Sequence, residues 1–211
     1  MSDLSKLREA LLKGDAKTVV AITKDSLAQG VKPEELLNKH MIPALDEAGR
    51  QFEANELFVP ELLLIGRAMK QALEIIRPLL ASTGVKPTGR VAIGTVKGDL
   101  HDIGKNLVAS MLEGGGFEVV DLGVDVTPEK FINAVKEKDV NIVALSALLT
   151  TTMPAMKAVI DTLKASGLRD KVKVIIGGAP VTQEFAEQIG ADGYSDNANG
   201  AVGIARKLIA A

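Results

Sequence analysis

The sequence predicts an α/β protein in which an N-terminal four-helix bundle precedes a flavodoxin-like (Rossmann-like) domain with a five-stranded parallel sheet. Apolar residues recur at helical spacing through residues 1–80, which is typical of amphipathic helices. After residue 90, short apolar runs alternate with amphipathic segments, as in proteins with parallel sheets. A stretch rich in Gly, Pro and Thr, residues 81–90, separates the two patterns. We therefore expect two domains, at residues 1–85 and 86–211.

The helical half is divided into four segments by Gly and Pro residues. The first two segments end at Gly14 and Gly30, since Gly is favoured just past the end of a helix. Pro33 and Pro60 suit the first turns of the third and fourth helices, and Pro43 is expected to kink the third. Short connections between them favour a small antiparallel bundle. The stripes expected to face its core are Leu4, Leu7 and Leu11, then Leu36, Leu37, Met41 and Leu45, then Leu62, Ile65, Met69, Ile76 and Leu80.

The second half contains five short apolar runs, which we interpret as strands. They lie at residues 91–96, 118–122, 141–147, 172–176 and, more weakly, 193–194. The helices expected between and after them lie near residues 103–114, 128–138, 153–166, 181–189 and 198–210. Runs that are apolar on both faces fit strands covered by helices on both sides. Five such units in sequence favour the flavodoxin-like strand order.

Composition excludes several classes of protein. The 27 acidic and 25 basic residues give a net charge of −2, which argues against a nucleic-acid partner. The chain has no Cys, which excludes disulfides, thiol nucleophiles and cysteine-ligated clusters, and its two His cannot form a His-rich metal cage. No apolar run approaches the ~20 residues that cross a bilayer, and the N-terminus has no apolar signal core. We expect a cytoplasmic protein with no membrane partner.

Chemistry is expected beyond the carboxyl ends of the strands, where ligands bind to open parallel sheets. Three loops meet there, at residues 97–104, 146–152 and 177–178. In the first, His101 follows Asp99 by two residues, and a nearby carboxylate can fix the tautomer of a metal-ligating His and raise its basicity. On position alone, a loop His that caps the next helix is an equal alternative. His40, inside a helical segment, is interpreted as structural.

Two other sites that use similar loops do not match. A phosphate-binding Walker loop requires Gly, four residues and then Gly-Lys-Ser/Thr, whereas here five residues separate Gly98 from Gly104, and Asn106 follows Lys105. A phosphoryl-accepting receiver domain requires an Asp at the end of the third strand, where this chain has Ser146. The run of Gly at residues 114–116 lies at the end of a helix and is interpreted as a helix stop.

Three motifs in order resemble those of cobalamin-binding domains. Asp99, His101 and Gly104 match the Asp-x-His-x-x-Gly signature, residues 146–148 look like the Ser-x-Leu element, and Gly177-Gly178 looks like the Gly-Gly element. Residues 52–60 resemble the helical cap of cobalamin-dependent methionine synthase, which methyl-carrying corrinoid proteins of methyltransferase systems share. The likeness covers nearly the whole chain and leaves no room for the substrate domains of methionine synthase. The stand-alone corrinoid protein is therefore the better match.

The resemblance implies roles for individual residues around a cobalamin or related cobamide. His101 would be the lower cobalt ligand, Asp99 would accept a hydrogen bond from its other ring nitrogen, and Thr152 would complete this relay. The nucleotide tail of the cobamide would enter a slot in the α/β domain. The further cofactor-binding candidates are Gly98, Asp102, Ile103, Gly104, Ser146, Leu148, Thr150, Gly177, Gly178 and Asn197. For Ser146, Thr150 and Thr152, an ordinary helix cap is the alternative.

The same resemblance implies that the bundle is a cap over the upper cobalt face. Phe52, Val59 and Leu62 match the apolar cap positions, although each could equally belong to the bundle core. The predicted function is that of a methyl carrier in one-carbon metabolism, methylated on cobalt during turnover. It has no catalytic residue of its own and is not a complete enzyme.

The expected partners are a substrate-specific methyltransferase, a second methyltransferase that serves tetrahydrofolate or coenzyme M, and a reductive activating protein. The methyl donor is left open among methoxyaromatics, methylamines, quaternary amines and methanol. Two alternatives remain, a cobalamin-dependent sensor or regulatory module and the small subunit of an adenosylcobalamin mutase. A sensor would need an output module, and mutase subunits generally lack the helical cap.

Overall fold

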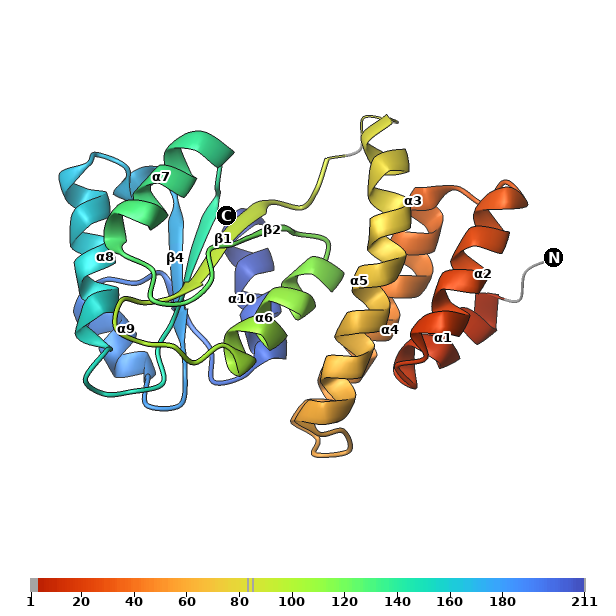
Figure 1. Cartoon of the computed structure of the whole chain (residues 1–211), viewed down its shortest axis with the longest axis horizontal. Coiled ribbons are helices and arrows are strands. Elements are labelled where there is room, and N and C mark those ends of the chain that lie inside the picture. The colour runs from red at the N-terminus through yellow and green to blue at the C-terminus, as the bar shows by residue number, and fades with distance from the viewer. Residues whose placement is uncertain (1–3, 83, 85, 211) are drawn as a thin grey trace. The chain divides into compact units, whose positions relative to one another are not determined.

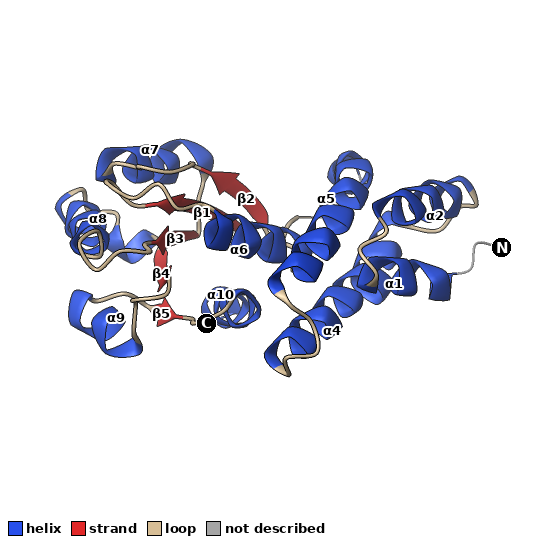
Figure 2. Cartoon of the chain, turned by 60° about the horizontal axis from the view of Figure 1, so that its bottom comes forward, coloured by secondary structure: helices blue, strands red, loops and turns tan. Residues whose placement is uncertain are grey.

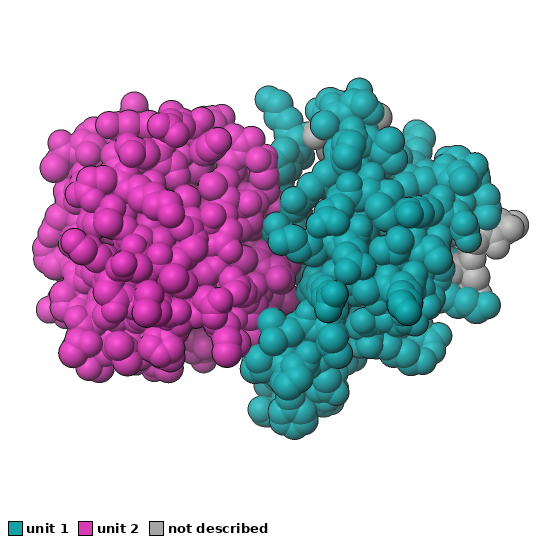
Figure 3. Space-filling model, in the orientation of Figure 1, with its two compact units in different colours: residues 1–87, 113–116 teal, residues 88–112, 117–211 magenta. Residues whose placement is uncertain are grey.

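The computed structural model describes residues 4–82, 84 and 86–210. The chain divides into two compact units, residues 1–87 with 113–116 and residues 88–112 with 117–211 (Figure 3). The first unit is helical and the second contains the sheet (Figure 1). The predicted fold class, a helical N-terminal part followed by a parallel α/β domain, is confirmed. Among the described residues, no helix combines the length and apolarity required to cross a membrane.

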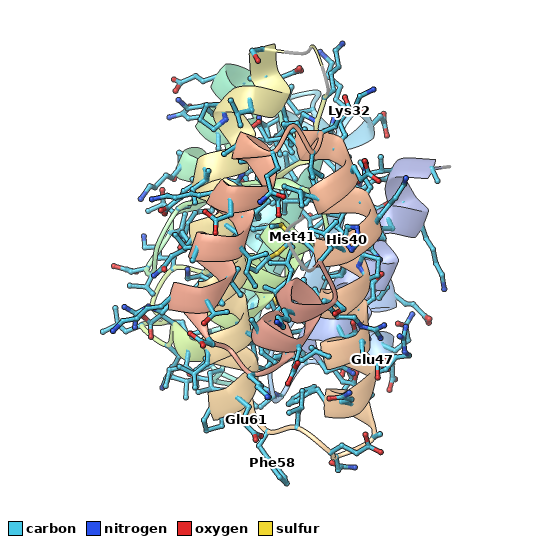
Figure 4. All side chains as sticks on the ribbon, turned by 90° about the vertical axis from the view of Figure 1, so that its right-hand side faces the viewer. Lys32, His40, Met41, Glu47, Phe58 and Glu61 are labelled. Atoms are coloured by element: carbon cyan, nitrogen blue, oxygen red, sulfur yellow. The ribbon has the colours of Figure 1, made fainter. Side chains whose placement is uncertain are left out.

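The helical unit is built from segments that match the predicted ones closely. They are α1 (Leu4–Leu12), α2 (Ala16–Ala28), α3 (Pro33–Glu35), the π-helical turn η1 (Leu36–Met41), α4 (Ile42–Glu53) and α5 (Val59–Ser82). Asp15 caps α2, because its carboxylate accepts from the Thr18 amide at 3.2 Å. At the start of α5, the Phe58 amide donates to the Glu61 carboxylate at 2.8 Å. Figure 4 shows Phe58 at this end of the bundle, pointing outward.

The irregularity expected at Pro43 takes the form of a π turn. The Ile42 amide bonds to the carbonyl of Leu37, five residues back, and α4 begins with Pro43 in its first turn. Proline has no amide hydrogen and its ring crowds the carbonyl four residues before it. The wider η1 turn therefore lies directly before Pro43, and α3, η1 and α4 follow one another without a loop between them.

The core of the helical unit contains the predicted stripes except Leu4, which is half-buried and packs against it. Leu7, Leu36, Met41, Met69 and Ile76 are fully buried in one cluster. Helix α5 continues to Ser82, so the connection to the sheet is shorter than the predicted 81–90 stretch. Two residues of that stretch, Thr83 and Val85, lie outside the described residues.

The α/β unit has five parallel strands in the order β2-β1-β3-β4-β5, which is the flavodoxin-like order. The strands are β1 (Arg90–Thr95), β2 (Glu118–Asp121), β3 (Ile142–Ser146), β4 (Lys173–Gly177) and β5 (Gly193–Tyr194). The helices are α6 (Ile103–Gly114), α7 (Pro128–Lys138), α8 (Pro154–Ala165), α9 (Gln183–Ile189) and α10 (Ala198–Ala210), with a short 3-10 turn η2 (Arg169–Lys171). Figure 2 shows α7, α8 and α9 on one face of the sheet and α6 and α10 on the other.

The register of the central strands brings the three predicted loops together. Thr95 at the end of β1 pairs with Ser146 at the end of β3, and Ser146 pairs with Gly177 at the end of β4. The sheet beneath is anchored by an apolar cluster that includes the fully buried Val143, Val174 and Phe131. Because these three strands end at the same level, the loops that follow them share one edge of a rigid sheet.

Candidate functional site

The loop between β1 and α6 holds His101 by its backbone. The His101 amide donates to Asp99 Oδ1 at 3.1 Å, and the Thr95 hydroxyl donates to the His101 carbonyl at 2.7 Å. Thr95 is completely buried at the end of β1, so this anchor belongs to the sheet itself. The His101 side chain nevertheless keeps 50% of its surface exposed.

The ring of His101 is fixed in one tautomer. Its Nδ1 lies 2.7 Å from Asp99 Oδ1. An ionised carboxylate can only accept hydrogen bonds, so Nδ1 carries the hydrogen and Nε2 keeps its lone pair. Within the part of the chain that the structure describes, Nε2 has no protein hydrogen-bond partner. The loop therefore offers one oriented nitrogen donor, which is what a metal ligand requires.

Asp99 is buried, with 1% of its surface exposed, and its charge is satisfied by the loop after β3. Oδ2 accepts from the Thr152 hydroxyl at 2.7 Å and from the amides of Leu148 at 2.8 Å and Leu149 at 3.3 Å. Burial alone would raise the pKa of Asp99, but these hydrogen bonds and those from His101 outweigh it and hold the pKa well below its usual range. Asp99 is therefore a fixed negative charge beside the imidazole.

A single imidazole cannot hold a metal ion by itself. Among the described residues, no group of three or more His, Cys, Asp or Glu side chains could bind one. A metal at Nε2 must then bring most of its ligands with it, as it does when it is held in an organic macrocycle. The surroundings suit such a group, because four aliphatic residues on these loops or at the start of α6 are exposed: Leu100, Ile103, Leu148 and Leu149, at 71%, 67%, 42% and 43% exposure.

Two of the predicted hydroxyl side chains, those of Ser146 and Thr150, are available to hydrogen-bond a ligand. In the described structure, neither the half-buried Ser146 side chain nor the exposed Thr150 side chain has a protein hydrogen-bond partner. Ser146 ends β3, and Thr150 lies on the loop after it, which also binds Asp99. The helix-cap alternative thus has no support at these two positions, whereas the Thr152 hydroxyl is engaged by Asp99 and lies 2.9 Å from the Leu149 carbonyl.

Gly177, which ends β4, and Gly178, which follows it, are constrained by packing in a way that the sequence did not reveal. A side chain at Gly178 would lie 1.9 Å from the carbonyl oxygen of Ala147, and Gly178 has φ of +134°, a conformation that favours glycine. A side chain at Gly177 would lie 3.0 Å from the carbonyl oxygen of Ser195. The resemblance assigned both glycines to cofactor binding. Close approach of neighbouring loops already requires glycine at Gly178 and leaves little space at Gly177.

Other predicted residues have local structural contacts. The side-chain oxygen of Asn197 accepts from the Gly200 amide at 2.8 Å and so caps α10. Asp102 accepts from the Asn106 side chain at 3.1 Å at the start of α6. Gly98 adopts φ of +85°, and a side chain at Gly104 would meet open space.

The three predicted cap residues differ in exposure. Leu62 is fully buried, Phe52 is half-buried and Val59 is 38% exposed. Val59 lies in the first turn of α5 and is therefore the member of the set with most surface available to a ligand.

Two residues that hold the site were not predicted. Thr95 and Asp125 both contact the backbone of the His101 loop, Thr95 at the His101 carbonyl and Asp125 at the Gly98 amide. Neither belongs to a recognisable motif. The only sequence signal for Thr95 was a polar residue near the end of the predicted first strand. Its contact with the His101 carbonyl depends on how the loop after the strand folds back.

Comparisons with known proteins agree with this chemistry. Residues 89–203 match a family model described as a B12 binding domain, and residues 4–77 match a second model with the same description. The trimethylamine corrinoid protein 2 of Methanosarcina mazei is 43% identical over 94% of this chain and 92% of its own length. The dimethylamine corrinoid protein of Methanosarcina barkeri is 41% identical over 98% of this chain and 97% of its own length.

Solved structures give the same picture. A cobalamin-binding protein from Desulfitobacterium hafniense DCB-2 has a TM-score of 0.81, with 34% identity over 99% of each chain. The methanol:cobalamin methyltransferase complex MtaBC of Methanosarcina barkeri contains a chain with a TM-score of 0.83 and 31% identity, covering 97% of this chain and 78% of that one.

Proposed function

The chain belongs to the B12-binding family of corrinoid proteins and binds cobalamin or a related cobamide, and from this premise we propose that it carries a methyl group from one methyltransferase to another. When bound, the cobamide supplies a cobalt centre that accepts and releases the methyl group. The side chains of this protein bind that centre, orient it and tune it.

One observation carries the proposal for the site. The half-exposed His101 imidazole has Nδ1 bonded to the buried Asp99, and this leaves Nε2 as an oriented donor. We propose that Nε2 of His101 is the lower ligand of cobalt. Asp99 would keep the ring in the donor tautomer, and the Thr152 hydroxyl would hold Asp99 in place. The hydroxyls of Ser146 and Thr150, together with the loop after β4, would bind the polar tail.

The helical unit would act as the cap of the upper face. The Phe52 and Val59 side chains keep part of their surfaces free, and we propose that they shield the reactive face of the cobamide from water. Leu62 is fully buried, so it would support the other two from behind. Of the two predicted domains, residues 1–85 would then cover the upper face of the cobamide, and residues 86–211 would bind the cobamide and supply the lower ligand.

The partners follow from the chemistry of a carrier. A substrate-specific methyltransferase would deliver the methyl group, a second one would pass it to tetrahydrofolate or coenzyme M, and a reductive activating protein would restore oxidised cobalt. The names of the relatives differ in the methyl donor, with trimethylamine, dimethylamine and methanol among them. We propose that the partner enzyme selects the donor, and that methylamines are the first class to test.

The ligand assignment is tested by electron paramagnetic resonance of the cobalt(II) form after reconstitution with a cobamide. The spectrum should show nitrogen hyperfine structure from imidazole that is lost in His101→Ala. The chain offers a matched control, because its only other His is His40 in the helical unit. His40→Ala should leave the spectrum unchanged. If the hyperfine structure survives in His101→Ala, the base of the cobamide itself is the ligand and the assignment is wrong.

The carrier role is tested separately by mixing the reduced holoprotein with purified methyltransferases for trimethylamine, dimethylamine and methanol. Substrate-dependent methylation with at least one of them is expected, followed by transfer to coenzyme M or tetrahydrofolate when the second enzyme is added. A holoprotein that stays unmethylated with every donor enzyme, but regulates a DNA-binding or catalytic partner, would favour the sensor or mutase alternatives.

A further inference from the structure

The loop between β2 and α7 is fastened to the His101 loop through one residue, Asp125. Asp125 Oδ1 accepts from the Gly98 amide at 2.7 Å, and the Asp125 amide donates to the Asp99 carbonyl at 3.0 Å. The same residue thus uses its side chain and its backbone on two consecutive residues, which are 27 and 26 positions earlier in the sequence. Gly98 directly precedes the Asp99–His101 pair, and Asp99 is its first member.

The backbone of Asp125 is in an unusual conformation. Its φ is +51°, in the left-handed region, which is unfavourable for a residue with a side chain although Asp and Asn tolerate it better than most. Gly98, its partner, also has positive φ, at +85°. The contact therefore joins two left-handed turns, and an ordinary loop residue at position 125 would present its amide and side chain in other directions.

A second attachment lies at the other end of the same segment. Lys105 follows Gly104 in the first turn of α6, and its side chain is 2% exposed. Its Nζ donates to both carboxylate oxygens of Asp121, at 2.7 Å each, and Asp121 also accepts from the Gly123 amide at 2.9 Å. Asp121 and Asp125 thus hold residues 98–105 from both ends, and the segment between them carries Asp99 and His101.

The β2–α7 loop does not depend on Asp125 for its own attachment to the sheet. The Thr95 amide donates to the Gly123 carbonyl at 3.0 Å, and the Val126 amide donates to the Thr95 carbonyl at 3.0 Å. These backbone bonds remain when the Asp125 side chain is changed. Loss of the carboxylate should therefore free the Gly98 end of the His101 loop without unfolding the domain.

We propose that Asp125 is a positioning residue, which fixes the start of the His101 loop so that the Asp99–His101 pair is already formed before a ligand binds. This inference rests on the proposed function in one respect, because it assumes that the position of His101 matters for cobalt ligation. Asp125 touches neither the imidazole nor any ligand atom. Its effect passes through the backbone of Gly98 and Asp99.

The test separates the side chain of Asp125 from its backbone conformation. Asp125→Asn keeps an acceptor oxygen and tolerates positive φ, Asp125→Gly keeps only the conformation, and Asp125→Ala keeps neither. Asp139 provides matched controls, because it is exposed, has φ of +52° and caps the far end of α7. The corresponding variants Asp139→Asn, Asp139→Gly and Asp139→Ala should have no effect on the loop.

The first measurement uses the apoprotein. With two His in the chain, its imidazole nitrogen spectrum contains His101 and one internal reference, His40. The Nδ1 proton of His101 should be visible and protected from solvent exchange in the native protein and in Asp125→Asn. In Asp125→Gly and Asp125→Ala its exchange should become at least tenfold faster while the His40 signals stay unchanged. Equal exchange in all three Asp125 variants and in the Asp139 variants would overturn the proposal.

The second measurement uses the reconstituted protein and distinguishes the two failures. If His101 ligates cobalt, Asp125→Ala should weaken cobamide binding about tenfold, the lower end of the effect of losing a supporting partner of a ligand, and Asp125→Asn should restore it. A native protein without imidazole hyperfine structure, in which Asp125→Ala still accelerates exchange at His101, would refute the ligand assignment and support the positioning role. Hyperfine structure in the native protein, with unchanged exchange and affinity in Asp125→Ala, would support the ligand assignment and refute the positioning role. Dispersed amide spectra of Asp125→Asn and Asp125→Gly establish that the fold is intact even if Asp125→Ala does not fold.

Discussion

Removing one hydroxyl from Thr152 should destabilise the α/β domain, because that hydroxyl supports a buried charge. In Thr152→Val the side chain keeps its shape and loses its 2.7 Å hydrogen bond to Asp99 Oδ2. A hydrogen bond to a charged group contributes about 1.5–3 kcal/mol. The carboxylate keeps its hydrogen bonds from the amides of Leu148 and Leu149 and from the backbone amide and ring Nδ1 of His101. We therefore expect the lower part of that range, about 2 kcal/mol off the free energy of unfolding.

Urea unfolding of the apoprotein at pH 7 measures this loss. Tyr194 lies in β5 and is the only Tyr in a chain without Trp, so its fluorescence reports on the sheet domain alone. A loss of about 2 kcal/mol lowers the urea midpoint by roughly 1 M, given the usual dependence of stability on urea. Thr151→Val is the matched control, because Thr151 is exposed next to Thr152. Thr152→Ser, which keeps the hydroxyl, should recover most of the stability.

The pH dependence has a definite sign. The pKa of Asp99 is lowered in the folded protein, so its stabilising contribution is complete above the ordinary Asp pKa of about 3.9 and is lost as pH falls through the folded-state pKa. Thr152→Val raises that folded-state pKa, so the stability that it loses as pH falls below about 3.9 should be smaller than in the native protein, and the loss should be complete at a higher pH. If Thr152→Val and Thr151→Val have the same urea midpoint at pH 7, the support of Asp99 by Thr152 is refuted.

Three further outcomes are expected. Asp99→Asn should retain cobamide but bind it about 10–100-fold more weakly in equilibrium titration, since the ligand loses its anionic partner. Gly178→Ala should lower the urea midpoint of the sheet domain sharply, because its side chain would meet the backbone after β3, whereas Gly104→Ala, which faces open space, should be tolerated. Phe52→Ala should speed photolysis of the methylated protein and Phe58→Ala should not, if Phe52 covers the upper face; equal rates would remove Phe52 from the cap.

Most of the fold could be predicted because strand and helix patterns are local. The strands at the centre of the sheet differ from their predicted ranges by one residue at each end, and the meeting of the three candidate-site loops follows from the strand order. Pro43 was predicted as the irregular point of the third helix, but the π turn before it depends on how the helix adapts to the missing hydrogen bond. The sequence pattern alone does not distinguish a π turn from a simple kink.

The site was predictable where a motif placed its residues close together or at a known spacing. Asp99, His101 and Thr152 were found in this way, and the structure brings them into one hydrogen-bonded chain. Thr95 and Asp125 were missed because each acts on the backbone of another residue, and a backbone contact leaves no requirement for a particular partner in the sequence. The need for glycine at Gly178 was likewise attributed to a ligand, when the carbonyl of Ala147 is enough to explain it.

The hydrogen-bond donors to Asp99 come from a distant part of the chain, and this links the order of the His101 ring to folding of the sheet. Two of them, Leu148 and Thr152, lie 49 and 53 residues further along the chain, and they reach Asp99 only after β1 and β3 have paired. The loss of conformational freedom by the loop therefore accompanies folding of the sheet and does not oppose a later binding event. The Asp99–His101 pair is therefore held by the same strand pairing that holds the sheet, and its order is part of the fold.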